Sequence, residues 1–194
     1  GMVPVSAALV SGKLHARAYG SEDRFDLHSS TYGGNALGCV TAQAAIELIL
    51  EQRLVENAQA RGEQLQNGLK QRLAGHPLLR DIRGRGLLVG LELGPTDQGW
   101  LNQLAPSLVE LVSERLFGQW AALCLLEKGV LVQPASLRWE VLRLEPPLII
   151  TAEETDLLIQ KVCEVFESYG SIARVVTDAL SRIESQRKRG WRFP

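Results

Sequence analysis

At residues 28–35 the chain reads His28-Ser29-Ser30-Thr31-Tyr32-Gly33-Gly34-Asn35, immediately before a segment of helical periodicity that starts near Leu37. Two adjacent glycines let the backbone turn sharply and approach a ligand closely. The first N–H groups of the helix that follows would point back at the turn, where they attract an anion, and Thr31 would add a hydroxyl donor. The residues alone therefore predict either a simple turn or a cradle for a phosphate or carboxylate.

The segments on either side of this stretch have clear patterns. From Asn35 onward apolar residues recur at helical spacing, which predicts one long helix, or two with a break near 51–53, ending at Gly75 before Pro77. Residues 3–10 are apolar and small, which predicts a buried strand. Residues 12–26 are polar, and we expect a surface loop there.

The residue pattern of the C-terminal part of the chain predicts strands and helices. The expected strands are 82–93, 130–134 and 141–148, and the expected helices are 107–128, 151–168 and 171–186. Capping boxes that begin at Ser107 and Thr151 mark two of the helix starts. The last strand has to close at Pro146-Pro147, because proline has no N–H to donate to a strand ladder. This order predicts an α/β fold with an antiparallel three-stranded sheet.

Composition limits the classes of function. The chain has 194 residues, a net charge of −1, 45% hydrophobic and 22% charged residues, which gives no electrostatic basis for binding nucleic acid or membrane. No apolar run reaches the roughly 18 residues of a membrane span. Its three cysteines, at 39, 124 and 163, are far apart, which indicates reduced thiols and a cytoplasmic protein. The basic tail at 182–192 is interpreted as a solvated terminus or a dimer contact.

Four segments in order resemble the signatures of class III pyridoxal-phosphate aminotransferases, the family that includes ornithine, acetylornithine and putrescine aminotransferases. Residues 28–35 resemble its His-Gly-Ser-Thr-Phe/Tyr-Gly-Gly-Asn motif, and residues 1–7 resemble the stretch just after its cofactor lysine. Residues 83–88 resemble its Arg-Gly-x-Gly-Leu-Leu strand entry. Residues 142–148 resemble its hydrophobic-Arg-hydrophobic-x-Pro-Pro-Leu strand. The resemblance covers roughly residues 1–168.

The resemblance implies the C-terminal portion of a fold type I pyridoxal-phosphate-dependent transferase. Residues 1–50 would be a remnant of the large cofactor-binding domain, and 51–75 the connecting helix. Residues 76–170 would form the small C-terminal α/β domain, and 171–194 an extra helix and tail. In this layout the small domain holds an antiparallel sheet.

The resemblance also implies a reaction and site residues. Members transfer an amino group from an amino acid or amine to a keto acid, with pyridoxal 5'-phosphate as cofactor and a site shared across a homodimer. The matching threonine, Thr31, would donate to the cofactor phosphate of the neighbouring subunit, with Ser30 beside it. Arg143 would bind the substrate α-carboxylate. The structural alternatives are a helix-capping Thr31 and a strand Arg143 paired with Glu140 or Glu145.

In this family the lysine that holds the cofactor comes shortly before the segment that matches residues 1–4. We therefore expect this chain to lack the catalytic lysine, and we expect the isolated chain to be inactive. No residues are assigned to a metal. A second hypothesis is a non-catalytic dimerising remnant that binds no cofactor.

Overall fold

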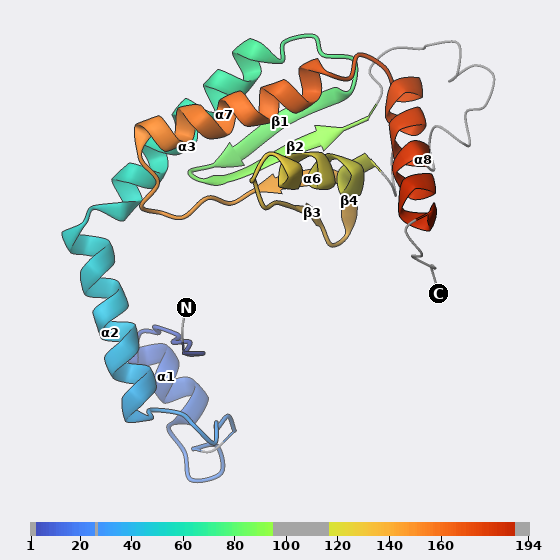
Figure 1. Cartoon of the computed structure of the whole chain (residues 1–194). Coiled ribbons are helices and arrows are strands. Elements are labelled where there is room, and N and C mark those ends of the chain that lie inside the picture. The colour runs from blue at the N-terminus through green and yellow to red at the C-terminus, as the bar shows by residue number, and fades with distance from the viewer. Residues whose placement is uncertain (1–2, 26, 95–116, 189–194) are drawn as a thin grey trace. The chain divides into compact units, whose positions relative to one another are not determined.

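The computed structural model describes residues 3–25, 27–94 and 117–188 (Figure 1). The chain divides into two compact units, an N-terminal unit, Gly1–Leu54, and a C-terminal unit, Val55–Pro194. Within the described ranges, no helix combines the length and the apolar character that crossing a bilayer requires. The assignment of the four predicted segments to a large and a small domain stays a prediction.

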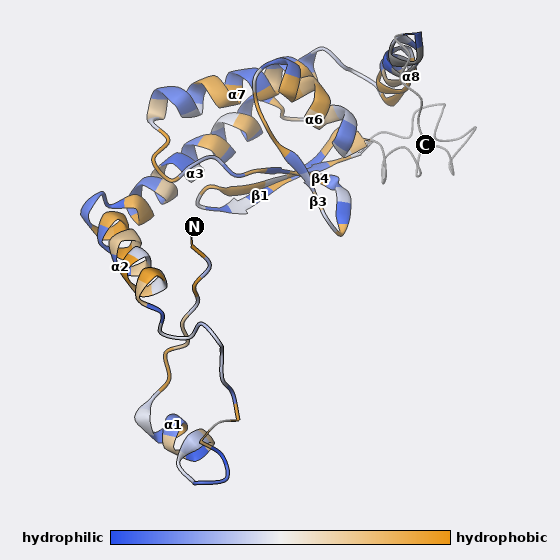
Figure 2. Ribbon diagram, turned by 60° about the horizontal axis from the view of Figure 1, so that its bottom comes forward, coloured by the Kyte–Doolittle hydropathy of each residue, from blue (hydrophilic) through white to orange (hydrophobic). Residues whose placement is uncertain are grey.

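In its described residues the N-terminal unit contains two helices, α1 (Gly12–Tyr19) and α2 (Ala36–Glu51). Most of α2 is apolar (Figure 2). The prediction of a surface loop at 12–26 is wrong at α1, which begins where the Ser11 hydroxyl accepts a hydrogen bond from Leu14 N–H. The predicted buried strand at 3–10 is also wrong, because this segment is largely exposed and has no strand partner among the described residues.

The C-terminal unit is built from a four-stranded sheet and helices. Its elements are α3 (Leu54–Arg72), which starts at the unit boundary, β1 (Leu79–Arg85), β2 (Leu88–Leu93), α6 (Phe117–Glu127), β3 (Gln133–Ala135), β4 (Arg138–Leu144), α7 (Ala152–Glu167) and α8 (Ile172–Lys188). The predicted break between two helices near 51–53 is confirmed: α2 ends at Glu51, and Arg53 has a φ of 50°. The predicted helix end at Gly75, which has a φ of 69°, is confirmed to within three residues.

The sheet has the order β1-β2-β4-β3, and every neighbouring pair is antiparallel. The prediction of an antiparallel sheet is confirmed, but the prediction of three strands is wrong. The segment 82–93, expected as one strand, belongs to a hairpin in which β1 pairs with β2, with Arg85 opposite Leu88. The turn between them lies at Gly86-Leu87, inside the Arg-Gly-x-Gly-Leu-Leu motif.

Glycine at position 86 allows this hairpin to turn. Its φ of 52° lies in the left-handed region that favours glycine. A side chain on Gly62 of α3 would collide with the Gly86 carbonyl oxygen. Glycine at 62 therefore lets α3 lie directly against the hairpin turn, which fixes the helix on the sheet.

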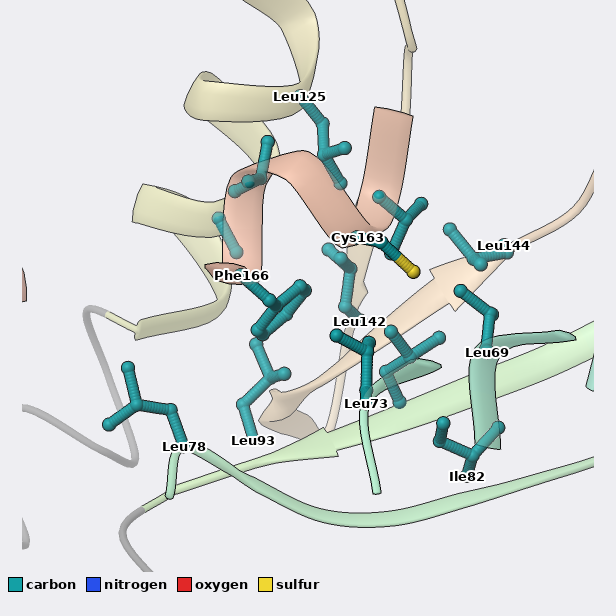
Figure 3. Packing of buried hydrophobic residues seen from close by; sticks show 14 of the residues in the cluster. Leu69, Leu73, Leu78, Ile82, Leu93, Leu125, Leu142, Leu144, Cys163 and Phe166 are labelled. Atoms are coloured by element: carbon teal, nitrogen blue, oxygen red, sulfur yellow. The ribbon is translucent and has the colours of Figure 1, made fainter. Parts of the chain in front are cut away.

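Helices α3, α6 and α7 bury one face of the sheet (Figures 1 and 3). The side chains that are almost completely inaccessible come from every one of these elements: Leu65, Leu69, Leu91, Leu93, Phe117, Leu125, Leu142, Leu144, Val162 and Phe166. Each large apolar side chain of this kind contributes about 1.5–3 kcal/mol when it is fully buried. One core therefore holds the whole C-terminal unit together.

The predicted start of α7 and the predicted ends of β4 and α6 agree with the structure. The Thr151 hydroxyl accepts from Glu154 N–H and the Glu154 carboxylate accepts from Thr151 N–H, so the capping box opens α7 as expected. Strand β4 ends two residues before Pro146. Helix α6 ends two residues before Gly129, whose φ is 75°. The capping box expected at Ser107 lies outside the described residues.

Helix α8 is attached to α6 by a polar cluster and by one core residue. The indole N–H of Trp120 donates to Asp178 Oδ2 at 2.9 Å, and Arg182 Nε donates to the same oxygen at 2.6 Å. Arg182 also contacts Glu127 on α6. Val175 is 1% exposed and belongs to the core. The expected helix at 171–186 is therefore a packed part of this unit.

The cluster predicts that Asp178→Ala destabilises the C-terminal unit by about 2 kcal/mol, because the Trp120 N–H loses its acceptor and Arg182 loses a charged partner. Burial alone raises the pKa of Asp178, but hydrogen bonds from Trp120 and Arg182 outweigh it and hold that pKa below the ordinary 3.8. The contribution of the ionised Asp178 to the free energy of unfolding is therefore complete above pH 3.8, and it is lost as the pH falls through the lowered pKa.

Urea unfolding followed by circular dichroism measures this difference at neutral and at acidic pH. The matched control is Glu184→Ala on the same helix, which removes an exposed pair with Lys188 and changes stability by less than about 0.5 kcal/mol. Equal stability of the two variants at neutral pH would contradict the role given to Asp178.

Candidate functional site

The motif at 28–35 forms two successive tight turns in front of α2. The Ser30 carbonyl accepts from Gly33 N–H at 3.0 Å, and the Tyr32 carbonyl accepts from both the backbone and the side-chain amide of Asn35, at 3.2 and 2.7 Å. Gly34 has a φ of 69°, so the second glycine of the motif is needed for the turn itself. The glycines therefore shape the backbone ahead of the helix.

The side chain of Asn35 caps α2. Its Oδ1 accepts from Gly38 N–H at 2.7 Å, which is the standard arrangement of an N-cap residue. The expectation that the first N–H groups of this helix are free for an anion is therefore wrong at Gly38. An asparagine directly before an apolar periodic run is a sequence signal for this cap.

Thr31 is exposed, and within the described residues its hydroxyl has no hydrogen-bond partner. The alternative that Thr31 caps the helix is wrong, because Asn35 occupies that position. Ser30 is likewise exposed, and only its carbonyl is engaged. Both hydroxyls are thus free to donate to a phosphate oxygen, which fits the chemistry of a phosphorylated cofactor.

Arg143 lies on β4 between Leu142 and Leu144, which point into the core and are 0% and 1% exposed. Because side chains alternate along a strand, Arg143 projects from the opposite, open face of the sheet. Its backbone neighbours in the sheet are Gly90 on β2 and Gln133 on β3. Gly90 leaves the position beside the arginine without a side chain.

The guanidinium of Arg143 has only one ionic partner among the described residues. Its Nη1 lies 3.4 Å from Glu145 Oε1, and both side chains are close to half exposed. Its Nε is buried and makes no hydrogen bond within the part of the chain that the structure describes. A partly exposed pair of this kind contributes at most about 1 kcal/mol, so it leaves the guanidinium available to bind a carboxylate.

A separate ionic network joins side chains of β1, β2 and β4. Arg83 contacts Asp81 at 2.7 Å and also Glu92. Arg138 contacts Glu92 and Glu140. Of the two carboxylates considered as partners of Arg143, Glu140 is therefore held by Arg138, and Glu145 is the one that pairs with Arg143.

The cysteines of the chain are free thiols, as expected. Cys124 and Cys163 are buried, and burial raises the pKa of both thiols, which keeps them protonated. In the described ranges no group of histidine, cysteine and acidic residues is arranged to hold a metal.

The predicted site residues belong to different units. Ser30 and Thr31 lie in the N-terminal unit and Arg143 in the C-terminal unit, and each is described within its own unit. Their assembly into one site stays a prediction.

Comparison with known proteins decides the family. Residues 1–166 match the family described as "Aminotransferase class-III". The chain belongs to the class-III aminotransferase family. Members of this family depend on pyridoxal phosphate, and the match includes all four motifs and ends inside α7.

The individual relatives are ornithine aminotransferases and related enzymes. The chain is 30% identical over 167 residues to ornithine aminotransferase 1 of Staphylococcus saprophyticus, covering 86% of this chain and 35% of that protein. A solved Bacillus anthracis aminotransferase is 30% identical with a TM-score of 0.61, covering 79% and 33% of the two chains. An ornithine aminotransferase from Toxoplasma gondii, described with pyridoxal phosphate at its active site, is 30% identical with a TM-score of 0.58, covering 73% and 29%.

These coverages show that the chain spans about a third of the length of the relatives it matches. The solved relatives confirm the predicted fold class, an α/β portion of a fold type I aminotransferase with an antiparallel sheet.

Proposed function

We propose that this chain is the C-terminal part of a pyridoxal-phosphate-dependent aminotransferase that moves an amino group from an amino acid or amine to a keto acid. The observation that carries the proposal is the family match across residues 1–166, which spans all four motifs. The cofactor supplies the carbonyl and electron-sink chemistry when it is bound.

Thr31 contributes to phosphate binding in this proposal, with Ser30 beside it. The exposed, unengaged hydroxyl of Thr31 donates to a phosphate oxygen of the cofactor held by the neighbouring subunit of a homodimer. A hydrogen bond to a charged group of this kind contributes about 1.5–3 kcal/mol. Asn35 supports it indirectly, because it closes the helix end and orders the turn that carries Thr31.

Arg143 binds the carboxylate of the amino donor and of the keto acid. Its planar guanidinium offers two parallel N–H donors, which match the two oxygens of a carboxylate. The flanking Leu142 and Leu144 are fixed in the core and hold the strand in place, so the arginine is presented from a rigid element. The substrate carboxylate replaces Glu145 as its partner.

A second candidate is a non-catalytic dimerising remnant that binds no cofactor. The pairing of Arg143 with Glu145, the first residue after β4, favours it, since the guanidinium then has a structural partner. The experiments below separate the two candidates.

We expect the purified 194-residue chain to show no transaminase turnover with ornithine, 2-oxoglutarate and added pyridoxal phosphate. The reason is that the cofactor lysine lies, by resemblance, before the segment that matches residues 1–4. Borohydride trapping followed by mass spectrometry should give scattered, sub-stoichiometric lysine labelling. Turnover well above that of free cofactor would contradict the proposal.

A chimera tests whether this chain supports cofactor binding and turnover when the rest of an aminotransferase is supplied. In it, this chain replaces the matching segment of the Staphylococcus saprophyticus enzyme, and we expect stoichiometric cofactor binding and turnover. A folded chimera that dimerises but binds no cofactor would favour the non-catalytic remnant.

In that chimera, Thr31→Val should weaken pyridoxal phosphate binding by about 10- to 100-fold, which corresponds to the loss of one hydrogen bond to a charged group. Cofactor absorbance during dialysis or titration measures the affinity. The control is Thr41→Val, since the Thr41 hydroxyl donates to the Leu37 carbonyl within α2. Equal effects of the two substitutions would exclude a phosphate contact by Thr31.

Arg143→Lys should raise the KM for 2-oxoglutarate by about tenfold or more, because lysine keeps the charge but cannot make two parallel bonds to one carboxylate. The control is Arg138→Lys on the same strand, whose arginine is held by Glu140 and Glu92. Steady-state kinetics with varied keto acid measure the change. An unchanged KM in the Arg143 variant would assign that arginine to structure alone.

A further inference from the structure

Gln133 lies directly beside Arg143 in the sheet. Strand β3 runs next to β4 (Figure 1), and their pairing places the Cα atoms of Gln133 and Arg143 opposite each other. Directly opposite residues of an antiparallel pair have Cβ atoms about 4.5–5.5 Å apart. The amide at the end of the longer glutamine side chain can therefore reach a small ligand that the guanidinium holds.

The side chain of Gln133 projects from the same face of the sheet as that of Arg143. The next residue, Pro134, pairs with the buried Leu142, and the residue before it, Val132, packs against the core. Because side chains alternate along a strand, Gln133 points to the open face, where it is exposed. The two polar side chains thus belong to one row that crosses from β3 to β4.

The amide of Gln133 is not engaged by the protein. Within the described ranges neither its nitrogen nor its oxygen has a hydrogen-bond partner. A glutamine offers two N–H donors and one acceptor oxygen, and it carries no charge. A neutral donor of this kind stabilises a bound anion without repelling the neighbouring guanidinium, as a second cation would.

Of the residues around Arg143 on the open face, Gln133 is the one that can add a donor. On β2 the paired residue is Gly90, which has no side chain. Val141, on the same face of β4, is apolar, and Glu145 is itself an anion. Among these described neighbours, the amide therefore has the chemistry that suits a carboxylate.

The guanidinium of Arg143 is incompletely satisfied by its present contacts. Glu145 Oε1 lies 3.4 Å from Nη1, which is long for a charge-assisted hydrogen bond. The buried Nε has no acceptor in the part of the chain that the structure describes. A buried donor without an acceptor is rare in folded proteins and is typical of a catalytic or ion-binding position. An incompletely bonded cation and a free amide thus lie side by side.

We propose that Gln133 is a second residue of the carboxylate subsite, and that its side-chain amide donates a hydrogen bond to the carboxylate that Arg143 binds. Arg143 supplies two parallel N–H donors and Gln133 a third, and Glu145 gives up its contact to the incoming carboxylate. This inference rests on the proposed function, because the amino acid and the keto acid of that reaction supply the carboxylate.

Nuclear magnetic resonance of the isotope-labelled 194-residue chain tests the subsite without the cofactor. The titrant is 2-oxoglutarate, and putrescine, which has no carboxylate, is the control at equal ionic strength. We expect the Arg143 Nε–H signal and the Gln133 side-chain N–H signals to shift together with 2-oxoglutarate and to saturate at the same dissociation constant. Neither set of signals should shift with putrescine.

Substitutions at 133 measure the contribution of the amide. Gln133→Leu should weaken 2-oxoglutarate binding by about tenfold, through the loss of one hydrogen bond to a charged group. Gln133→Glu should weaken it further, because the new carboxylate repels the ligand and gives Arg143 a second internal partner. The control is Ser136→Ala, an exposed position in the turn between β3 and β4, which should leave binding unchanged. Equal urea unfolding transitions show that all three variants fold alike.

The chimera with the Staphylococcus saprophyticus enzyme separates ligand binding from a merely structural role. There, Gln133→Leu should raise the KM for 2-oxoglutarate by about tenfold and leave kcat within about twofold, since the hydrogen bond is made equally in the bound substrate and in the transition state. Added to Arg143→Lys, the same substitution should have a smaller effect, because both side chains act on one carboxylate. A structural role would not produce this coupling.

Two results would overturn the inference. In the first, 2-oxoglutarate shifts the Arg143 signal but not the Gln133 signals, and Gln133→Glu binds as well as the original sequence. Gln133 would then be a solvated residue of an edge strand. In the second, neither side chain responds to 2-oxoglutarate, and the open face of the sheet holds no carboxylate subsite.

Failure of the proposed function gives a different result. In that case the chimera binds no pyridoxal phosphate and does not turn over, while the chain alone still shows the joint response of Arg143 and Gln133 to 2-oxoglutarate. Conversely, an active chimera whose KM rises with Arg143→Lys but not with Gln133→Leu keeps the function and removes the role of Gln133.

Discussion

The C-terminal unit depends on the burial of one face of its sheet. Strands β1, β2 and β4 each send leucine, isoleucine or valine to that face, and α3, α6 and α7 cover it with leucines and phenylalanines. Because strand side chains alternate, this requirement also decides what lies on the other face. Arg143 is exposed on the open face because Leu142 and Leu144 are held in the core. The same is true of Arg83 and Glu92, which are neighbours of buried residues on β1 and β2 and pair with each other.

Much of this architecture could be predicted from the sequence, because its signals are local. The capping box at Thr151, the helix break before Arg53 and the prolines after β4 act through neighbouring residues, and the structure agrees with each. The motif that contains Arg143 placed it on a strand between two buried leucines, as found. The family resemblance was likewise recognised from short ordered motifs.

The errors in the strands came from contacts between residues distant in sequence. The segment 82–93 was expected to be one strand, and its turn at Gly86 depends on the approach of α3 at Gly62, which no local pattern reveals. Residues 3–10 have the composition of a buried strand, but a strand needs a neighbour, and the described chain provides none. Thr31 was the helix cap that the sequence analysis considered for α2, and the structure gives that place to Asn35.

The position of α8 bears on where this domain ends. The family match stops at residue 166, inside α7, yet Val175 is part of the core and Trp120 depends on Asp178 for its hydrogen bond. A boundary drawn from sequence similarity would cut through an aromatic and ionic contact and uncover the side of α6 that carries Trp120 and Cys124. The packed C-terminal unit thus extends beyond the end of the family match. The core of the C-terminal unit therefore includes a residue of a helix that lies beyond the family match.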